Sequence, residues 1–234
     1  MPGVTGNVAR QLEVLDREPG PRARRFDNET TLRGRTAVLP SAFNPPTLAH
    51  EHLLRTALDA FGLEHALALL TTRNVDKGVH GASLADRVGM LLAMREEWPA
   101  LSVAASNQAR IIDQALALTG AFPSATFDFV VGFDTLERLF ARRYYTDMEA
   151  ELAPFFERHR VLAANRGAVE AHEVTAWIHA NAGAFSNRIL LLEIGKEPAS
   201  LSSTQAREAA SADAGDLAAP AAVVRYVREH GLYR

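Results

Sequence analysis

Short apolar runs alternate with amphipathic stretches along most of the chain, starting near Thr36. The apolar runs have the length of strands, and we predict strands at residues 36–41, 65–71, 101–105, 126–132, 159–164 and 187–194. The intervening stretches repeat apolar residues at helical spacing and predict helices at roughly 48–60, 83–97, 107–119, 147–157 and 171–181. Strands and helices that alternate in this way are typical of a parallel sheet covered on both faces. The pattern therefore predicts a doubly wound α/β sheet of about six strands.

Two helix boundaries follow from local side-chain chemistry. Ser83 precedes an apolar helical stripe, with the acidic Asp86 three residues later, which indicates a helix start. Near the C-terminus, Pro220 suits a first helical turn, and Gly231 suits the end of the same helix. The chain is therefore expected to end with a helix whose valines are packed on the core.

The first 34 residues differ from this pattern and are expected to form an N-terminal appendage to a domain spanning residues 35–234. Val8, Leu12 and Leu15 have the spacing of a short helix. A Pro-Gly-Pro turn and a cluster of arginines at positions 22, 24 and 25 follow. We interpret the arginines as the solvated face of a linker rather than as a binding site.

Composition restricts the class of protein. The chain has 234 residues, 47% of them hydrophobic, so it can bury a sizeable core. The 25 lysines and arginines against 28 acidic residues leave a net charge of -3, which provides no general attraction to nucleic acid or to an anionic membrane. The absence of cysteine excludes disulfides, thiolate catalysis and cysteine-bound metals.

No segment has the character of a targeting sequence. Arg10, Glu13 and Asp16 interrupt the apolar residues near the N-terminus, so a signal peptide is not expected. No stretch approaches the ~20 apolar residues that cross a membrane. We therefore expect a soluble, cytoplasmic protein without nucleic-acid or membrane partners, and leave a homo-oligomer open.

The loop after the first predicted strand of the sheet is the first candidate for a site. Ligands of open parallel sheets bind at the carboxyl ends of the strands, and this loop reads SAFNPPTLAH from Ser41 to His50. Pro45 and Pro46 restrict its backbone, and the small Ser41 and Ala42 allow a ligand to approach closely. A helix follows, and its first amides are expected to be free to face the loop.

Helical phase separates the two histidines of this region. His50 lies on the same helical stripe as Leu53, Leu54 and Ala57, whereas His52 is about 200° round the helix from His50. We expect His50 at the mouth of the site and His52 in solvent. A core histidine with satisfied hydrogen bonds is the alternative for His50, and a zinc site is disfavoured because no third ligand is suggested nearby.

A second candidate lies in the segment SLSSTQAR, from Ser200 to Arg207. A capping box predicts that a helix begins here, with Ser203, Thr204 and Arg207 in its first turns. Free amides, hydroxyls and a guanidinium at a helix start together favour a polyphosphate. The alternative is an ordinary helix cap with one solvated arginine.

The two segments together resemble the nucleotidylyltransferase superfamily, through F-N-P-P-T-x-x-H after the first strand and a late S-S-T-x-x-R. Within it, the chain resembles the nicotinamide or nicotinate mononucleotide adenylyltransferases. Further matches are Gly-Phe-Asp at 132–134, Asn-Arg-Gly at 165–167 and the C-terminal stretch AAVVRYVREHGLY. The resemblance covers residues 36–234.

Some positions depart from the family pattern. Ser41 stands where a glycine is usual, Thr47 where many bacterial members have histidine, and Ala49 where the bacterial form has glycine. The family often carries a tryptophan after Asp134 that stacks on the pyridine ring. This chain has none there, so Tyr144 or Tyr145 would have to provide the ring.

The resemblance implies a Rossmann-like fold and the transfer of an adenylyl group from ATP to a mononucleotide phosphate, with release of pyrophosphate. It implies no protein nucleophile and no protein metal site, with Mg²⁺ carried by the ATP phosphates. The residues implied for catalysis are His50, Thr47 and Arg207. The residues implied for ATP binding are Ser41, Ala42, Phe43, Lys77, Gly132, Asp134, Ser203 and Thr204. The residues implied for acceptor binding are Asn44, Tyr145 and Arg166.

Three alternatives stay open at this point. Asp134 could be the N-cap of a helix at TLERLF. The acceptor could be another phosphorylated compound such as phosphopantetheine, because the ATP site would be the same. The chain could also be a nucleotide-binding regulator without catalytic activity, given the altered first loop. The sequence does not choose between the amide and the acid form of the pyridine.

Overall fold

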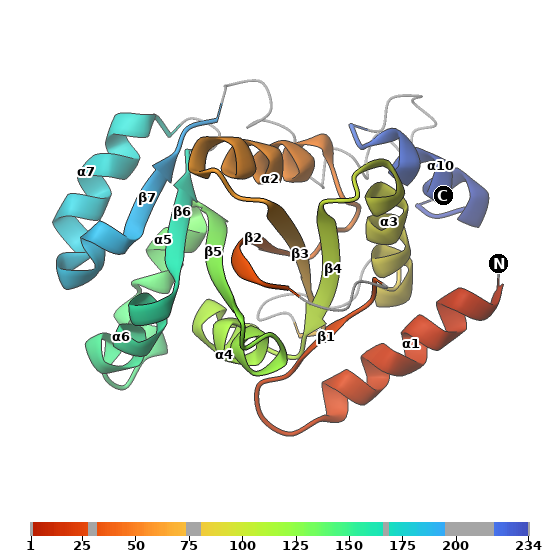
Figure 1. The fold of residues 1–234 in the computed structure, drawn as a ribbon, viewed down its shortest axis with the longest axis horizontal. Coiled ribbons are helices and arrows are strands. Elements are labelled where there is room, and N and C mark those ends of the chain that lie inside the picture. Colours follow the sequence, from red (N-terminus) through yellow and green to blue (C-terminus); the bar gives the residue numbers. More distant parts are fainter. Residues whose placement is uncertain (1, 28–31, 74–80, 166–168, 195–217, 234) are drawn as a thin grey trace.

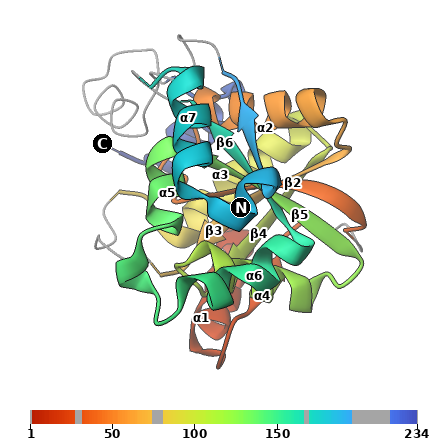
Figure 2. The same cartoon turned by 90° about the vertical axis from the view of Figure 1, so that its left-hand side faces the viewer.

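A central sheet with helices on both faces organises the molecule (Figures 1 and 2). The structure is a computed structural model that describes residues 2–27, 32–73, 81–165, 169–194 and 218–233. Within these residues the sheet has seven strands in the order β1-β4-β3-β2-β5-β6-β7. The strands are β1 (Ala23–Arg25), β2 (Gly34–Ser41), β3 (His65–Thr71), β4 (Leu101–Ser106), β5 (Ala125–Gly132), β6 (Arg160–Ala164) and β7 (Ile189–Leu192). Strand β1 is antiparallel to β4, and the other neighbours are parallel.

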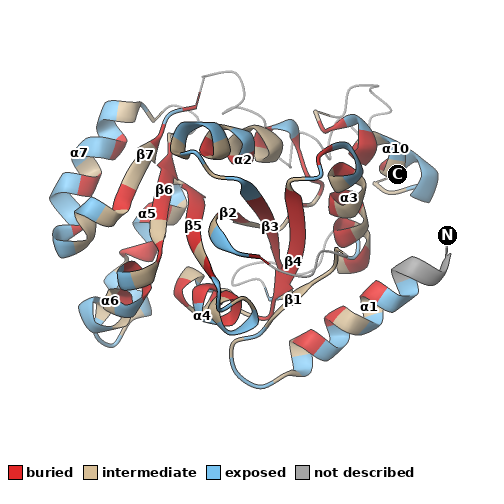
Figure 3. Ribbon diagram, viewed as in Figure 1, coloured by how far each residue is buried: buried red, intermediate tan, exposed pale blue. Residues whose placement is uncertain are grey.

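Strands β2 to β6 are largely buried on both faces, which explains why they read as continuous apolar runs. Successive side chains alternate between two cores: Leu39 joins one core and Val38 the other. Figure 3 shows the central strands almost wholly buried. The first core is covered by α1 (Pro2–Arg17), α2 (Leu48–Phe61), α3 (Leu84–Glu97) and α10 (Ala221–His230). The second core is covered by α4 (Ile111–Ala121), α5 (Phe133–Leu139), α6 (Met148–Arg158) and α7 (Ala171–Asn181).

The strand order places a topological switch point between β2 and β5. From β2 the chain winds outward through β3 to β4, then crosses to β5 on the other side of β2. The connections on the two sides of the switch point leave in opposite directions, so a crevice is expected at the carboxyl ends of β2 and β5. The predicted doubly wound sheet is confirmed, with β1 as the additional strand.

The predicted helix boundaries agree closely with the structure at several ends. The Ser83 hydroxyl accepts a hydrogen bond from the Asp86 amide at 3.1 Å, and Gly231 ends α10 in the left-handed conformation. Helix α4 starts at Ile111 rather than at 107, because Asn107 is used elsewhere: its side-chain oxygen accepts from the Arg22 amide at 2.8 Å. No helix in the described part of the chain is long and apolar enough to cross a membrane.

The N-terminal segment packs on the same sheet as the rest of the chain. Val8, Leu12 and Leu15 are buried in the first core, and α1 lies beside α3. The interpretation of the arginine cluster as a solvated linker is wrong for Arg25, whose side chain is 9% exposed and forms an ion pair with Asp27 at 2.6 Å. The reason is the pairing of β1 with the edge of β4. The division of the chain at residue 34 stays a prediction.

His159 is a buried, neutral side chain that packs against phenylalanine rings of the second core. It is 3% exposed, and its Nδ1 accepts from the Phe127 amide at 3.2 Å. Burial, reinforced by the positive charge of Arg158, lowers the pKa of His159 from 6.5 to about 4. The folded protein therefore excludes a proton that the unfolded chain binds below pH 6.5.

We expect the free energy of unfolding to fall as the pH drops from about 6.5 to about 4, by up to about 3 kcal/mol from this side chain. Urea unfolding at several pH values measures the slope of the free energy of unfolding against pH. His159→Gln should flatten the slope in this window, whereas His172→Gln, at an exposed position, should leave it unchanged. An identical slope in His159→Gln and the wild type would contradict the assignment.

Candidate active site

The loop between β2 and α2 lies at the switch point and has an unusual backbone. Phe43 has a φ of 44°, in the left-handed region that bulky residues rarely adopt, and the Asn44–Pro45 peptide is cis. Phe43 is only 1% exposed, and its ring lies 4.9 Å from the ring of His50. Packing therefore holds a conformation that turns the chain sharply from the strand into the helix.

His50 projects from the first turn of α2 back onto this loop. Its Nδ1 accepts the Thr47 amide hydrogen at 3.0 Å and lies 2.8 Å from the Thr47 hydroxyl. Its Nε2 lies 3.0 Å from the Ser41 hydroxyl. Because Nδ1 accepts from a backbone amide, the neutral ring carries its proton on Nε2. The ring thus presents an N–H donor at the carboxyl end of β2.

The structure brings together the predicted residues Ser41, Thr47 and His50. His50 is half-buried and Thr47 fully buried, and both belong to the cap of α2 as well as to the loop. The alternative of a core histidine with satisfied hydrogen bonds therefore describes part of its role. What distinguishes His50 is that its Nε2 contacts a hydroxyl at the strand end rather than an atom of the core.

The second histidine of the helix, His52, is less exposed than predicted. His52 is half-buried rather than in solvent, and its Nε2 lies 3.5 Å from the Thr56 hydroxyl, one turn further along α2. Its ring therefore contacts α2 itself. Among the described residues, no three histidine or acidic side chains are grouped closely enough to hold a metal ion.

Arg87 of α3 and Ala82, which precedes the helix, contact the loop in ways that the sequence did not predict. Arg87 is 3% exposed and donates to the backbone oxygens of Ala82 at 3.0 Å and Ala42 at 3.3 Å. The Asn44 side-chain oxygen accepts from the Ala82 amide at 3.2 Å. One signal was available: Arg87 lies on the apolar stripe of Leu84 and Leu91, where a charged residue must have a buried partner.

The end of β5 forms the other side of the switch point. Gly132 is the N-cap of α5, which begins at Phe133, so the alternative that Asp134 caps this helix is wrong. The Asp134 side chain is 72% exposed, and its carboxylate lies 3.5 Å from the Arg138 guanidinium. Asp134 is therefore an accessible carboxylate in the first turn after the strand.

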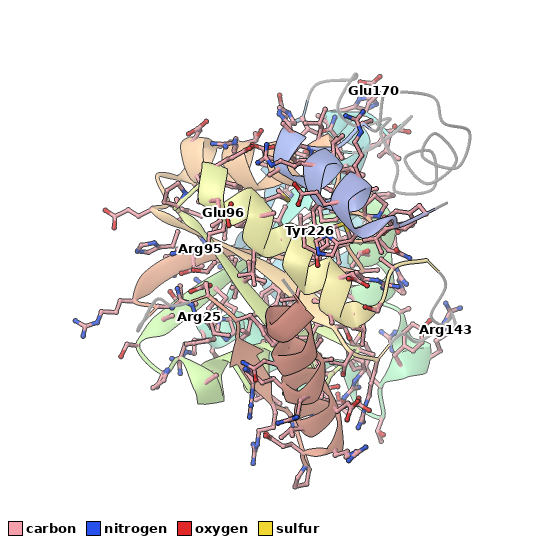
Figure 4. The ribbon with its side chains drawn as sticks, turned by 90° about the vertical axis from the view of Figure 1, so that its right-hand side faces the viewer. Arg25, Arg95, Glu96, Arg143, Glu170 and Tyr226 are labelled. Atoms are coloured by element: carbon pink, nitrogen blue, oxygen red, sulfur yellow. The ribbon has the colours of Figure 1, made fainter. Side chains whose placement is uncertain are left out.

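The two tyrosines after α5 have different environments. The Tyr145 hydroxyl donates to the Leu139 backbone oxygen at 2.5 Å, and its ring packs against the second core. Burial raises the pKa of Tyr145 to about 12. Tyr144 is 37% exposed, and the Arg143 guanidinium lies 4.9 Å from its ring centre. Figure 4 shows Arg143 projecting at the surface.

At the start of α2, a backbone amide that was expected to be free has a hydrogen-bond partner. The Leu48 amide, one of those expected to be free, donates to the Ala218 backbone oxygen at 3.0 Å. The Asn165 side chain, at the end of β6, bonds the Ile194 amide at 2.8 Å. Ile194 and Ala218, which flank in sequence the segment that contains S-S-T-x-x-R, thus lie near the end of β6 and the start of α2.

Several predicted site residues lie outside the described residues. These are Lys77, Arg166, Ser203, Thr204 and Arg207. The remaining ones lie between the end of β2 and the first turn of α2 or between the end of β5 and the first turn of α5, with Tyr145 further along the chain in the α5–α6 connection.

The chain is similar in sequence to enzymes that act on nucleotides. Residues 38–209 match the model of the cytidylyltransferase-like family. A Schizosaccharomyces pombe protein provisionally named nicotinamide mononucleotide adenylyltransferase is 32% identical over 133 residues, which cover 55% of this chain and about half, 52%, of that protein. A Neisseria meningitidis protein provisionally named nicotinate-nucleotide adenylyltransferase is 28% identical over 200 residues, which cover 82% of this chain and 94% of that protein.

Solved structures show the same fold at low sequence identity. The nicotinic acid mononucleotide adenylyltransferase of Plasmodium falciparum, solved in complex with NaAD, superposes with a TM-score of 0.64 and 16% identity. The superposition covers 86% of this chain and 98% of that protein. At this identity the similarity establishes the fold alone.

Proposed function

Because the family model matches most of its length, this chain belongs to the cytidylyltransferase-like family, and we propose that it transfers the adenylyl group of ATP to nicotinamide or nicotinate mononucleotide. Such an activity would place it in NAD biosynthesis. The observation that carries the proposal is the loop at the switch point, in which His50, Thr47 and Ser41 contact one another at the end of β2. A phosphate-binding loop is expected at this position of the fold.

The reaction is a single displacement at phosphorus. A phosphate oxygen of the mononucleotide attacks the α-phosphorus of ATP, the bond from that phosphorus to the bridging oxygen breaks, and pyrophosphate leaves with that oxygen. The catalyst must hold two polyanions in line and stabilise negative charge on the leaving group. No residue has to become covalently modified.

The Nε2–H of His50 is suited to the leaving group. Thr47 holds Nδ1 as an acceptor, so the ring is fixed with its donor directed at the strand end. A phosphate oxygen would replace the Ser41 hydroxyl as the partner of Nε2. The buried Arg87 guanidinium beneath Ala42 adds a positive charge below the loop. These features stabilise charge that increases as pyrophosphate leaves.

The remaining assignments are proposals that follow the family resemblance. Mg²⁺ would enter as part of the ATP substrate, neutralising phosphate charge. Asp134 is exposed enough to accept hydrogen bonds from ribose hydroxyls, and Gly132 adjoins it. The residues proposed for the ATP phosphates are Ala42, Phe43, Lys77, Ser203, Thr204 and Arg207. Asn44, Tyr145 and Arg166 are proposed for the acceptor.

A coupled assay of pyrophosphate release tests the function. ATP is supplied with nicotinamide mononucleotide, nicotinate mononucleotide or phosphopantetheine in separate reactions. Release with either pyridine mononucleotide, and not with phosphopantetheine, supports the proposal and identifies the preferred pyridine. Release with phosphopantetheine alone would assign another acceptor. ATP binding without release from any of the three would indicate a nucleotide-binding regulator.

The aromatic partner of the pyridine can be tested separately. If Tyr145 stacks on the ring, Tyr145→Ala should weaken mononucleotide binding about tenfold, equivalent to ~1.4 kcal/mol, and leave ATP binding unchanged. Isothermal titration of each ligand measures this, with Tyr144→Ala as the matched variant. A loss confined to Tyr144→Ala would move the contact to the exposed ring. Equal losses for both ligands in Tyr145→Ala would remove Tyr145 from the acceptor site.

A further inference from the structure

The last residues of the described chain return to the loop at the candidate active site. The Tyr233 hydroxyl donates to the Asn44 side-chain oxygen at 2.7 Å, across 189 residues of sequence. Asn44 lies between the left-handed Phe43 and the cis peptide to Pro45. Tyr233 lies outside the part of the chain that matches the family model, residues 38–209.

A rigid path connects this contact to the body of the protein. Val223 and Val227 of α10 are buried in the first core, and α10 packs on α3. Gly89 of α3 makes that packing close, because a Cβ there would lie 2.2 Å from the Tyr226 hydroxyl oxygen. Figure 4 shows Tyr226 where α10 crosses α3.

After α10 the chain continues as a short tail, residues 231–233. Gly231 has a φ of 60°, and the Leu232 amide donates to the Val227 backbone oxygen at 3.1 Å, which ends the helix. Tyr233 itself has a φ of 63°, a conformation that non-glycine residues seldom adopt. A tail that only ended a helix would not require this second left-handed residue, which directs the tyrosine to the loop.

Two donors converge on one oxygen of Asn44. The Ala82 amide, 3.2 Å away, and the Tyr233 hydroxyl, 2.7 Å away, both donate to Oδ1. An asparagine amide can flip by half a turn and exchange its oxygen and nitrogen. The flipped state is disfavoured because the Ala82 amide, which can only donate, would then face an NH₂ group, and the Tyr233 hydroxyl would have to change from donor to acceptor. The Asn44 amide is therefore fixed with its oxygen toward α3 and the tail.

Gly81 also packs closely against the Asn44 amide. A Cβ at Gly81 would lie 2.8 Å from Asn44 Oδ1 and 3.1 Å from Cε1 of Tyr233. Gly81 has a φ of 83°, so its backbone as well as its size favours glycine. The segment before α3, the tail and the loop thus meet around one side chain.

We propose that Tyr233 is a positioning residue for adenylyl transfer, holding the Asn44 amide in the one orientation that contacts the mononucleotide. This inference rests on the proposed function. The mononucleotide offers phosphate and hydroxyl oxygens, which an NH₂ group can donate to. A flipped Asn44 would present an oxygen to these groups and would repel the phosphate. Tyr233 does not itself have to touch substrate.

Tyr233→Phe removes the hydroxyl and retains the ring. We expect kcat/KM for the mononucleotide to fall about tenfold, which corresponds to ~1.4 kcal/mol, while the KM for ATP and the melting temperature change little. Tyr226→Phe is the matched control, because its hydroxyl lies in the same C-terminal region but faces Asp86 at 3.5 Å. It should leave both kinetic constants unchanged.

A double-mutant cycle separates positioning from a direct role. In the Asn44→Ala background Tyr233→Phe should cost almost nothing further, because the group that it orients is gone. An additional tenfold loss in that background would overturn the proposal, since Tyr233 would then act independently of Asn44. Gly81→Ala, which displaces Asn44 from another side, should reproduce the effect of Tyr233→Phe on kcat/KM for the mononucleotide.

One measurement is independent of activity. The side-chain amide signals of Asn44 in a ¹⁵N spectrum, identified by their loss in Asn44→Ala, should shift or broaden in Tyr233→Phe and not in Tyr226→Phe. Unchanged signals would overturn the proposal whatever the enzyme does. If the signals respond but the wild-type protein releases no pyrophosphate with any acceptor, the proposed function fails while the orientation of Asn44 by Tyr233 stands.

Discussion

Replacing His50 with alanine should lower kcat at least about 100-fold while leaving the fold intact. The ring supplies one preorganised N–H donor, fixed on Nε2 by the Thr47 amide, and removing one such donor from a transition state costs ~2.7 to 4 kcal/mol. The loss should fall on kcat more than on the KM for ATP, because negative charge on the leaving group is greatest in the transition state. Steady-state kinetics of the pyrophosphate assay measure both constants.

His52→Ala is the matched control for this prediction. His52 lies on the same helix and contacts Thr56 rather than the loop, so we expect its replacement to change kcat less than about twofold. Equal losses in the two variants would show that the helix, not the His50 ring, carries the effect. The His50 variant also loses part of the α2 cap, so its melting temperature must be compared with that of His52→Ala.

Asp128→Asn should destabilise the fold by about 2 to 3 kcal/mol without any direct effect on the site. The Asp128 carboxylate is fully buried between two arginines, with Arg35 at 2.6 Å and the Nε of Arg160 at 3.0 Å. Removing one partner of a buried ion pair typically costs ~3 to 5 kcal/mol. Both guanidiniums are partly exposed and can be hydrated after the change, so a loss smaller than this range is expected.

Chemical denaturation of the variant measures this loss. Glu97→Gln is the control, since Glu97 pairs with Arg225 at 2.9 Å but both side chains are about half exposed. Exposed pairs contribute ~0 to 1 kcal/mol, so the control should remain close to the wild type. If Asp128→Asn were as stable as Glu97→Gln, the network of Asp128, Arg35 and Arg160 would not stabilise the sheet.

The sheet could be predicted from the sequence because its strands are buried on both faces. The runs containing Leu67 and Phe129 have no reason to be uniformly apolar unless helices cover both sides, and both residues are fully buried. Strand β1 could not be predicted in this way. It is a three-residue edge strand that includes two arginines, and only its pairing with β4 makes it a strand.

The site could be predicted in part for a similar reason. Contacts close in sequence, such as His50 with Thr47, follow from helical spacing and cap chemistry. Contacts distant in sequence, such as Tyr233 with Asn44, depend on how α10 packs on α3 and leave no local pattern. The occupied amide of Leu48 was missed on the same grounds, since its partner Ala218 lies far along the chain.

The central claim is that this protein joins the adenylyl group of ATP directly to a pyridine mononucleotide, and a single-turnover reaction tests it most directly. Excess protein is mixed with ATP labelled at the α-phosphorus and with the mononucleotide, then quenched at intervals. We predict that the label passes from ATP to the dinucleotide in step with pyrophosphate release, and that none is attached to protein. Label that remained in ATP, appeared as free AMP or was found on the protein would contradict the claim.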